Sequence, residues 1–282
     1  MSSQPVSAET QRSPAPAVAR PKMSPRKRAR ISQGIQYAIL LLIVVLALLA
    51  MDWRKLGTEM FNVSVIGSML SDLPHAFANT LTYSVAAFIV GLSLGMVLAL
   101  MKMSSVGPYR WLATAYAEFF RGIPALLVVL SIGFLIPILF GVKLPNMTVK
   151  IGIALGLVSA AYVSETLRAG LQAVPKGQVE AARSLGLTQS QAMVSVVIPQ
   201  AFRIVLPPLT NELILITKDT SFVYLLGLAT SEYELTKLGT NALNQANGGL
   251  TGVVVVGLVY LIITLPLGHL ARRMEKRNAR QR

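Results

Sequence analysis

Six long apolar stretches, joined by shorter polar segments, restrict what this chain can fold into. A transmembrane helix needs roughly 20 predominantly apolar residues to cross the hydrocarbon core of a bilayer. The stretches of sufficient length cover residues 34–51, 79–101, 116–140, 147–169, 207–228 and 251–271, and several polar residues interrupt the fifth. Together they predict an all-α, polytopic transmembrane bundle with six spans.

The composition supports a membrane protein and excludes several kinds of site. Of the 282 residues, 53% are hydrophobic and 13% are charged, whereas a soluble domain carries about 25% charged residues. Cysteine is absent, and the two histidines, His75 and His269, are far apart. The chain therefore offers no disulfide framework, thiolate metal site or cysteine nucleophile. We expect no metal site and no catalytic residues.

Lysine and arginine are unevenly distributed between alternate loops. With the N-terminus placed in the cytoplasm, the cytoplasmic segments contain 19 of the 26 basic residues and the outer loops contain 5. Because basic residues accumulate in cytoplasmic loops, both termini and the segment 180–199 are expected in the cytoplasm. The chain is therefore predicted to be a multi-pass protein of the cell membrane.

The two ends of the chain are basic. Residues 1–33 are rich in Ser, Pro, Ala and Arg and lack an apolar period, which predicts a disordered cytoplasmic tail. The cluster PKMSPRKRAR within it favours anionic lipid or a topology signal over nucleic acid, because a span follows directly. That span lacks a clear cleavage site after it, which favours an uncleaved helix over a signal peptide. Residues 272–282 are predicted to form a second basic cytoplasmic tail.

Glycines recur at small-xxx-small spacing in two of the spans. Gly91 and Gly95 lie in the second span, and Gly152 and Gly156 lie in the fourth. Such spacing lets helix backbones approach closely in lipid, where apolar surface alone gives little drive to pack. Packing inside one bundle is the preferred interpretation, and a dimer face is the alternative.

A polar segment between the fourth and fifth spans has the signals of two short helices. Residues 174–177, VPKG, are typical of a turn, and Gly186 suits the left-handed position that ends a helix. Thr188 and Gln191 have capping-box spacing, so a second helix is expected to begin there and to break at Pro199. The small side chains of the segment suit docking into the groove of a partner, and an interfacial connector is the alternative.

This segment resembles the E-A-A loop of ABC importer permeases. The matching residues are Glu180, Ala181, Ala182, Gly186, Val196, Ile198 and Pro199, with Val and Ile where that pattern usually has Ile and Leu. Further segments are similar to permeases of the polar amino-acid, histidine/glutamine type: ANTLTYSV (78–85), YAEFFRGIPALL (116–127), SAAYVSETLRAGLQAVPKGQ (159–178) and LTNELILITKDTSFVYLLG (209–227). The resemblance covers about 78–275, and residues 34–77, an extra N-terminal span and external loop, depart from it.

The resemblance implies a five-helix, type I permease core over 78–271, with a cytoplasmic coupling loop at about 174–203. It implies a transport subunit rather than an enzyme, which carries a polar amino acid delivered by an external solute-binding protein. The implied partners are cytoplasmic ATPase subunits and a second permease, either a copy or a paralogue. The chain has no G-x-x-x-x-G-K-[ST] loop, so ATP and Mg²⁺ are expected on the partner ATPase. The implied coupling residues are Glu180, Ala181, Ala182, Gly186 and Pro199.

Ionisable residues inside the fifth predicted span mark a candidate substrate path, because charges at membrane depth are costly. Lys218 and Asp219 are expected near the middle of that span, and Asn211 and Glu212 lie two helical turns earlier on the same side. A path with both signs of charge suits a zwitterionic amino acid, and the alternative is that Lys218 and Asp219 only pair with each other. The candidate path residues are Asn211, Glu212, Lys218, Asp219, Thr220 and Ser221.

Two acidic–basic pairs have i, i+3 spacing on predicted helices, Glu118 with Arg121 and Glu165 with Arg168, and neighbours at this spacing can pair. A gating or structural role is preferred for them over direct substrate contact. The tetrapeptide that begins at Arg121, RGIP, also predicts a kink or a helix boundary.

A secondary transporter driven by an ion gradient, with Asp219 or Glu118 as proton carrier, is the main alternative function. It predicts two-half internal repeats, which are not evident, and it leaves the E-A-A segment unexplained. An intramembrane enzyme ranks third, because the chain has no cysteine and neither histidine lies centrally in a span.

Overall fold

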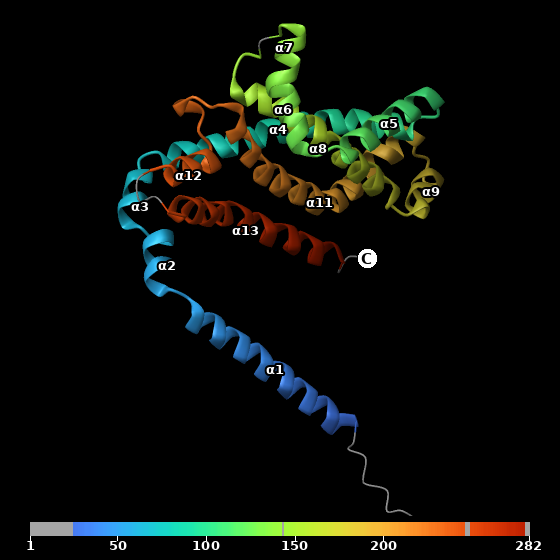
Figure 1. Ribbon diagram of the computed structural model, residues 1–282. Helices are drawn as coiled ribbons and strands as arrows, with labels where there is room; N and C mark the ends of the chain where they lie inside the picture. Colours follow the sequence, from blue (N-terminus) through green and yellow to red (C-terminus); the bar gives the residue numbers. More distant parts are fainter. Residues whose placement is uncertain (1–24, 143, 246–248, 280–282) are drawn as a thin grey trace, which may run out of the picture. The chain divides into compact units, whose positions relative to one another are not determined.

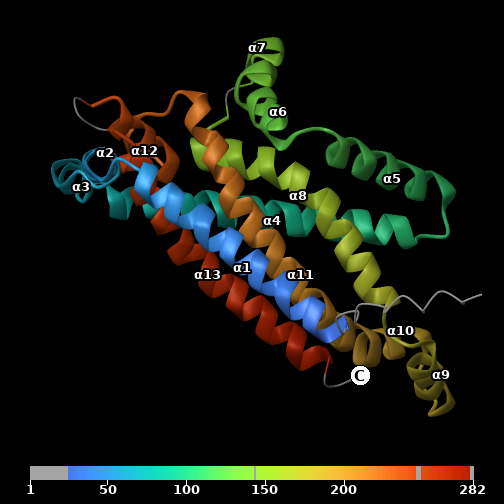
Figure 2. The ribbon, with the colours of Figure 1, turned by 60° about the horizontal axis from the view of Figure 1, so that its bottom comes forward.

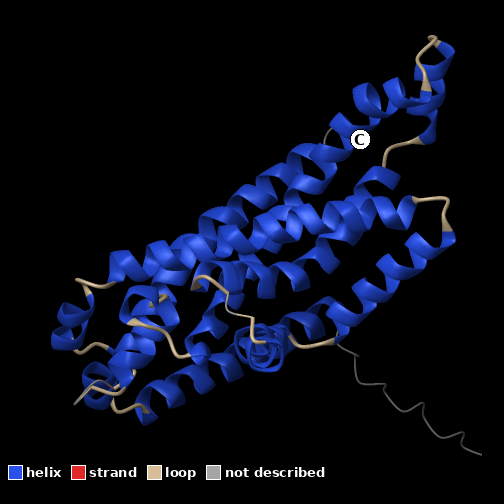
Figure 3. Cartoon of the chain, turned by 90° about the horizontal axis from the view of Figure 1, so that it is seen from above, coloured by secondary structure: helices blue, strands red, loops and turns tan. Residues whose placement is uncertain are grey.

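The computed structural model describes residues 25–142, 144–245 and 249–279 of the chain. These residues form helices and loops, and no strand occurs among them (Figure 3). The expected all-α architecture is thereby confirmed. The chain divides into two compact units, Met1–Trp53 and Arg54–Arg282.

The first unit contains α1 (Pro25–Ala50). Its segment Ala29–Ala50 is long and apolar enough to cross a membrane. Residues 25–33, predicted to belong to a disordered tail, begin this helix, so that boundary was wrong. Pro25 fits the first position of a helix, and the Arg, Lys and Ala residues after it are strong helix formers. The remainder of the predicted tail, residues 1–24, lies outside the described residues.

The rest of the chain forms long helices joined by shorter helical segments (Figure 1). The long helices are α4 (Leu73–Met103), α8 (Met147–Gln172), α11 (Ile198–Asp219) and α13 (Thr251–Ala279). The shorter α-helices are α2 (Trp53–Met60), α3 (Val63–Met69), α5 (Gly107–Gly122), α6 (Ala125–Leu130), α7 (Ile136–Phe140), α9 (Lys176–Ser184), α10 (Gln189–Ala192) and α12 (Leu235–Leu243). The π-helical turns are η1 (Ser131–Leu135) and η2 (Met193–Val197), and the 3-10 segments are η3 (Thr220–Leu226) and η4 (Thr230–Glu232).

Within the second unit, α8 packs on both α4 and α11, and α11 packs on α13 (Figure 2). The main apolar core lies between α4, α8, α6 and the end of α11. Its most deeply buried members include Ala87, Val129, Ile151 and Val223, which are all fully buried. This packing places α8 and α11 side by side, and these two helices supply most of the candidate site described below.

The described residues contain five helices that are long and apolar enough to cross a membrane, or six if one bent pair counts as a single span. That pair joins Gly107–Gly122 to Ala125–Phe140 at an angle of 101°, so the predicted span 116–140 is not a continuous helix. The helix breaks at Ile123, which has extended backbone angles, because the residue before Pro124 is disfavoured in the α conformation. The predicted boundary at this point is confirmed.

Close packing between α4 and α8 depends on the spaced glycines. A Cβ atom on Gly91 would lie 2.7 Å from the Ser159 hydroxyl oxygen, and one on Gly95 would lie 2.7 Å from Val163. A Cβ on Gly156 would meet α4 at a similar separation. The preferred interpretation, packing inside one bundle, is therefore confirmed: the glycines let the two backbones approach each other.

The start of α11 differs from the predicted fifth span. The helix begins at Ile198 rather than near Pro207, and both Pro207 and Pro208 lie inside it. Lys218 and Asp219 are therefore its last two residues, and the expectation that they lie near mid-helix was wrong. A proline usually ends a helix because it has no N–H and its ring crowds the preceding turn, which is why the prediction began there.

A contact from α13 accommodates the first of these prolines. Because Pro207 has no N–H, the carbonyl of Arg203, four residues earlier, lacks its intrahelical donor. Asn278 on α13 donates from Nδ2 to that carbonyl at 2.6 Å. Prolines are tolerated inside membrane helices where a neighbouring helix satisfies the freed backbone group, as Asn278 does here for Pro207.

Glu234 fixes the start of α12 against α13. Its side chain is fully buried, and its two carboxylate oxygens accept hydrogen bonds from the backbone N–H groups of Thr236 and Lys237 at 2.6 and 2.7 Å. Tyr260 on α13 donates its hydroxyl to the same carboxylate at 3.3 Å. Burial raises the pKa of Glu234 to about 7, although these hydrogen bonds act in the opposite direction. The sequence reading did not single this residue out.

Candidate functional site

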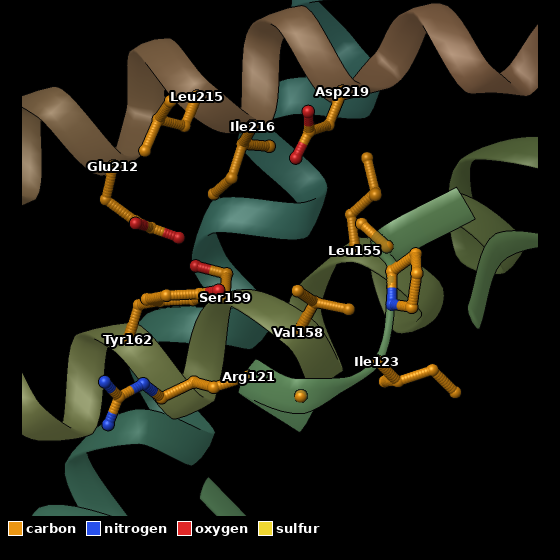
Figure 4. A pocket seen from close by; sticks show the side chains of 13 residues that line it. Arg121, Ile123, Leu155, Val158, Ser159, Tyr162, Glu212, Leu215, Ile216 and Asp219 are labelled. Atoms are coloured by element: carbon orange, nitrogen blue, oxygen red, sulfur yellow. The ribbon is translucent and has the colours of Figure 1, made fainter. Parts of the chain in front are cut away.

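A cavity of about 500 Å³ lies between α8, α11 and the break that separates α5 from α6 (Figure 4). Pockets of about 300–1,000 Å³ are typical of sites for small molecules. The bend at Pro124 forms one wall, and facing turns of the two long helices form the others. The lining residues are Arg121, Gly122, Ile123, Pro124, Ala125, Leu155, Val158, Ser159, Tyr162, Glu212, Leu215, Ile216 and Asp219.

Two carboxylates on α11 face this cavity. Glu212 and Asp219 are seven residues apart, which places them on the same side of the helix, and both point from α11 toward α8 (Figure 4). Both residues are half-buried, and no basic side chain among the described residues forms an ion pair with either within 4.0 Å. No group of three or more His, Cys, Asp or Glu side chains that could hold a metal ion occurs in that part of the chain.

The other four predicted path residues do not line the cavity. Lys218 and Asn211 are exposed, on other sides of α11. Thr220 is buried and donates its hydroxyl to the Thr217 carbonyl at 2.7 Å. Ser221 is half-buried in the 3-10 segment that follows. The cavity therefore brings together the two acidic members of the predicted set.

The wall that α8 supplies was missed by sequence reasoning. The Ser159 hydroxyl is buried and points toward the Glu212 carboxylate (Figure 4), the acceptor to which it is placed to donate. The Tyr162 ring lies beside it. The sequence shows only a serine inside an apolar span, which does not by itself indicate a site, and the crossing of α4 and α8 is what places Ser159 in the wall.

Arg121 provides the basic group at the edge of the cavity. It is close to the end of α5, and its guanidinium lies 5.9 Å from the centre of the Tyr162 ring. Its Nη1 is 3.8 Å from a carboxylate oxygen of Glu118, and both side chains are largely exposed. The predicted i, i+3 pair exists, but as a loose surface contact, and Arg121 also faces the cavity.

The second predicted pair, Glu165 with Arg168, is a closer contact. Arg168 Nη2 lies 2.8 Å from Glu165 Oε2, and the other carboxylate oxygen is 2.5 Å from Lys102 Nζ on α4. The Lys102 side chain is 5% exposed, although Lys102 lies just beyond the predicted second span, 79–101. This cluster joins α4 to α8 three or more residues beyond Tyr162, the last cavity residue of α8.

The polar segment after α8 forms a hairpin of α9 and α10. Gly186 has φ +89°, so the predicted left-handed conformation is confirmed. Its N–H donates to the Arg183 carbonyl, and the N–H of Leu187 donates to the Ala182 carbonyl, which is the hydrogen-bond pattern of a helix C-terminal Schellman motif. The capping box between Thr188 and Gln191 is confirmed as well, with both reciprocal hydrogen bonds present.

The second short helix does not end where the sequence predicts. From α10 the chain continues through the π-helical turn η2 directly into α11, and Pro199 occupies the first turn of α11, so the expected break at Pro199 was wrong. The wider π turn changes the hydrogen-bond register just before a residue that has no N–H to donate. The hairpin is thus continuous, through helical residues, with a helix that lines the cavity.

The hairpin has a buried side and an exposed side. Ala182 is buried, and Val174, Val197 and Ala201 form a small apolar cluster, against which Val179 packs. Exposed on the other side are Glu180 and Ala181, together with Leu185, which is 83% exposed.

Comparison with protein families gives one match that covers most of the chain. Residues 91–280 match the family described as "Binding-protein-dependent transport system inner membrane component". That range includes every lining residue of the cavity and the whole α9–α10 hairpin.

Individual relatives are similar over most of their own length. The arginine transport system permease protein ArtQ of Bacillus subtilis (strain 168) is 36% identical over 203 residues, 72% of this chain and 90% of that protein. The glutamate/aspartate import permease protein GltK of Escherichia coli O157:H7 is 33% identical over 225 residues, 78% and 99% respectively. Among solved structures, an amino acid ABC transporter with histidines matches with a TM-score of 0.67 at 34% identity, over 75% of this chain and 96% of that one.

Proposed function

Because the chain belongs to the family of binding-protein-dependent transport system inner membrane components, we propose that it forms half of an amino-acid pathway driven by a separate ATPase. The chain is a multi-pass membrane permease subunit of an ABC amino-acid importer. In the proposal, an external solute-binding protein delivers a polar amino acid, and a second permease, identical or paralogous, completes the pathway. ATP and Mg²⁺ belong to cytoplasmic ATPase subunits. Both termini of this chain lie in the cytoplasm.

The observation that carries this proposal is the α9–α10 hairpin. Its exposed side presents Glu180, Ala181 and Leu185 to a partner, and the left-handed Gly186 fixes the angle between the two short helices. A small, rigid projection with an exposed apolar tip suits insertion into a groove. Its continuity with α11 through η2 gives movement at the hairpin a direct route to Glu212 and Asp219.

The cavity supports the second half of the proposal, the substrate path. It lies within helices of membrane-spanning length, and its lining combines apolar side chains with a few charged ones. Ionisable side chains inside a membrane bundle usually face a substrate or ion pathway. Glu212, Asp219 and Arg121 give this cavity the polar groups that an amino acid requires.

Substitution of Gly186 tests the coupling role. In Gly186→Val, a β-branched residue is forced to a positive φ, which costs about 1–3 kcal/mol and displaces α10 relative to α9. Glu180→Lys reverses a charge on the exposed side without changing the backbone. We expect both variants to reach the membrane at normal levels, to copurify with much less ATPase, and to lose substrate-stimulated ATP hydrolysis.

Gly107→Val is the matched control. Gly107 is exposed at the start of α5, has an ordinary φ, and leaves space for a Cβ without contact to described atoms within 4 Å. This variant should copurify with the ATPase as the unaltered chain does. A Gly186→Val permease that binds its ATPase and transports at the normal rate would show that the hairpin only connects two spans.

A further inference from the structure

A second hollow lies away from the cavity, where the start of α11 meets the end of α13. Its smaller part, of about 230 Å³, is lined by Arg203, Leu206, Met274, Arg277 and Asn278. Its larger part, of about 820 Å³, shares Arg203 and Asn278 and extends to the end of α8 and the start of α9. We call the two parts together the α11–α13 groove. It shares no lining residue with the cavity of the candidate site.

The charge in the groove is of one sign. Arg203 from α11 and Arg277 from α13 both line its smaller part, and no Asp or Glu among the described residues lines either part. Neither guanidinium has a carboxylate within 4.0 Å in the part of the chain that the structure describes. Arginine stays charged at physiological pH, and its planar fork of N–H groups matches a phosphate group. The groove therefore offers two cationic donors to an anion.

The apolar residues of the groove lie on the side of the transmembrane segments. The end of α13 meets the start of α11, because Asn278 donates to the Arg203 carbonyl at 2.6 Å, and the two helices run antiparallel (Figure 2). On each helix the apolar lining residue is three residues closer to the helix middle than the arginine: Leu206 follows Arg203, and Met274 precedes Arg277. The groove is thus charged toward the helix ends and apolar about one helical turn deeper.

The position of the groove along α13 corresponds to the surface of a bilayer. Residues 251–271 contain no Asp, Glu, Lys or Arg, whereas four of the residues 272–279 are Lys or Arg. Apolar side chains nearby are open to the surroundings, since Phe202 is 58% exposed and Leu270 is 49% exposed. The groove therefore lies where acyl chains give way to polar headgroups.

We propose that the α11–α13 groove binds an anionic phospholipid from the leaflet on the hairpin side, which is the cytoplasmic leaflet in the topology proposed above. The lipid phosphate lies between the guanidinium groups of Arg203 and Arg277, and its acyl chains run along Leu206 and Met274. Basic pockets between transmembrane helices are known to bind anionic headgroups. A zwitterionic lipid fits less well, because its ammonium group finds no acidic partner in the groove.

The larger part of the groove extends this contact to the hairpin. Gln178 on α9 and Gln200 on α11 line it, and Gln200 Nε2 donates to Gln178 Oε1 at 3.5 Å. Their amide groups are suited to hydrogen bonds with the glycerol hydroxyls of a phosphatidylglycerol headgroup. One bound lipid therefore contacts α9, α11 and α13 together, and its binding stabilises the arrangement in which they are packed.

Native mass spectrometry of the purified full chain measures this binding, and it requires neither transport nor the ATPase. The chain is stripped of lipid in a neutral detergent and titrated with phosphatidylglycerol, or with phosphatidylcholine that has the same acyl chains. We expect phosphatidylglycerol to bind at least about tenfold more tightly, since hydrogen bonds to charged groups contribute about tenfold or more in affinity. Inorganic phosphate at the same concentration should not displace the lipid, because it has no acyl chains.

Paired variants then locate the site. Arg203→Gln combined with Arg277→Gln removes both guanidinium groups but keeps the backbone carbonyl at position 203, and it should weaken phosphatidylglycerol binding by about tenfold or more. Arg272→Gln combined with Arg273→Gln is the matched control. It removes the same charge from the same end of the bundle, and these two exposed residues do not line the groove. This control should bind phosphatidylglycerol as the unaltered chain does.

Four results overturn the inference. Equal affinity of the unaltered chain for the two lipids shows that the groove does not select an anionic headgroup, and this comparison needs no variant to fold. Equal losses in the two double variants show that the basic end of α13 attracts anionic lipid without a defined site. Binding that survives removal of both groove arginines places the lipid elsewhere. Displacement by inorganic phosphate identifies a site for free anions instead of lipid.

Discussion

Glu165 holds two basic side chains at once, and they lie in different surroundings. The Lys102 side chain is 5% exposed and that of Arg168 is 37% exposed. Removing one partner of a buried ion pair leaves an uncompensated charge and costs several kcal/mol, whereas exposed pairs contribute about 0–1 kcal/mol. The two contacts of Glu165 therefore have unequal weight, and the contact between α4 and α8 is the stronger one.

Glu165→Gln should consequently destabilise the bundle by roughly 1–3 kcal/mol, because it leaves the buried Lys102 ammonium without a carboxylate, although the Glu165 side chain itself is 31% exposed. Arg168→Gln should cost about 1 kcal/mol or less. Thermal unfolding of the purified protein in one detergent, followed by the loss of helical signal, measures both. Equal decreases in unfolding temperature for the two variants would contradict this expectation. They would mean that the Lys102 ammonium reaches water and that its contact with Glu165 contributes no more than the exposed contact of Arg168.

At the scale of elements, the crossing of α4 and α8 determines how closely the α8 wall of the cavity can lie to the rest of the bundle. Gly91 and Gly95 present bare backbone to Ser159 and Val163, so the positions of α4 and α8 depend on the absence of two methyl groups. Because interiors are packed without spare volume, a single added methyl must push the helices apart or force a side chain out of its rotamer.

Gly95→Ala should destabilise the protein by about 1–3 kcal/mol, since its Cβ would lie 2.7 Å from Val163 Cγ1. Val163→Ala in the same chain should restore part of the loss by removing the atom that clashes. Gly257→Ala in α13 is the matched control, because a Cβ there meets no described atom within 4 Å. Unfolding temperatures that fall equally for Gly95→Ala and Gly257→Ala would show that the close crossing does not limit stability.

At the scale of elements, the sequence predicted those helix ends and breaks that depend on a few neighbouring residues. The break before Pro124, the left-handed Gly186 and the capping box at Thr188 depend on a few neighbouring residues, and each was predicted. The start of α11 was not, because Pro207 is accommodated by Asn278 from a helix 71 residues further along the chain. Long-range contacts of this kind leave no local signal.

The same distinction applies to the cavity. Glu212 and Asp219 were predictable as candidates because charge inside an apolar segment is rare. The sequence could not show that Lys218 lies outside the cavity, because that depends on which side of α11 packs on α8. Ser159 and Tyr162 have no unusual chemistry in the sequence, and only the helix crossing makes them part of the wall.

At the scale of the whole molecule, the cavity and the hairpin belong to the unit Arg54–Arg282 and share α11. The lining residues Glu212 and Asp219 lie on that helix, and the hairpin leads into its start without a break. Such an arrangement suits a device in which an event at the hairpin alters the cavity. We therefore propose that ATP hydrolysis on another chain powers transport through the cavity.

Uptake by proteoliposomes tests that claim most directly. Vesicles would contain the permease and its ATPase, with the solute-binding protein and radiolabelled L-arginine, L-glutamine or L-glutamate outside, and ionophores would abolish every ion gradient. We predict that uptake requires hydrolysable ATP enclosed in the vesicles and persists without a gradient. Uptake that proceeds without ATP, rises with an imposed ion gradient and stops when ionophores are added would contradict this account and identify a secondary transporter.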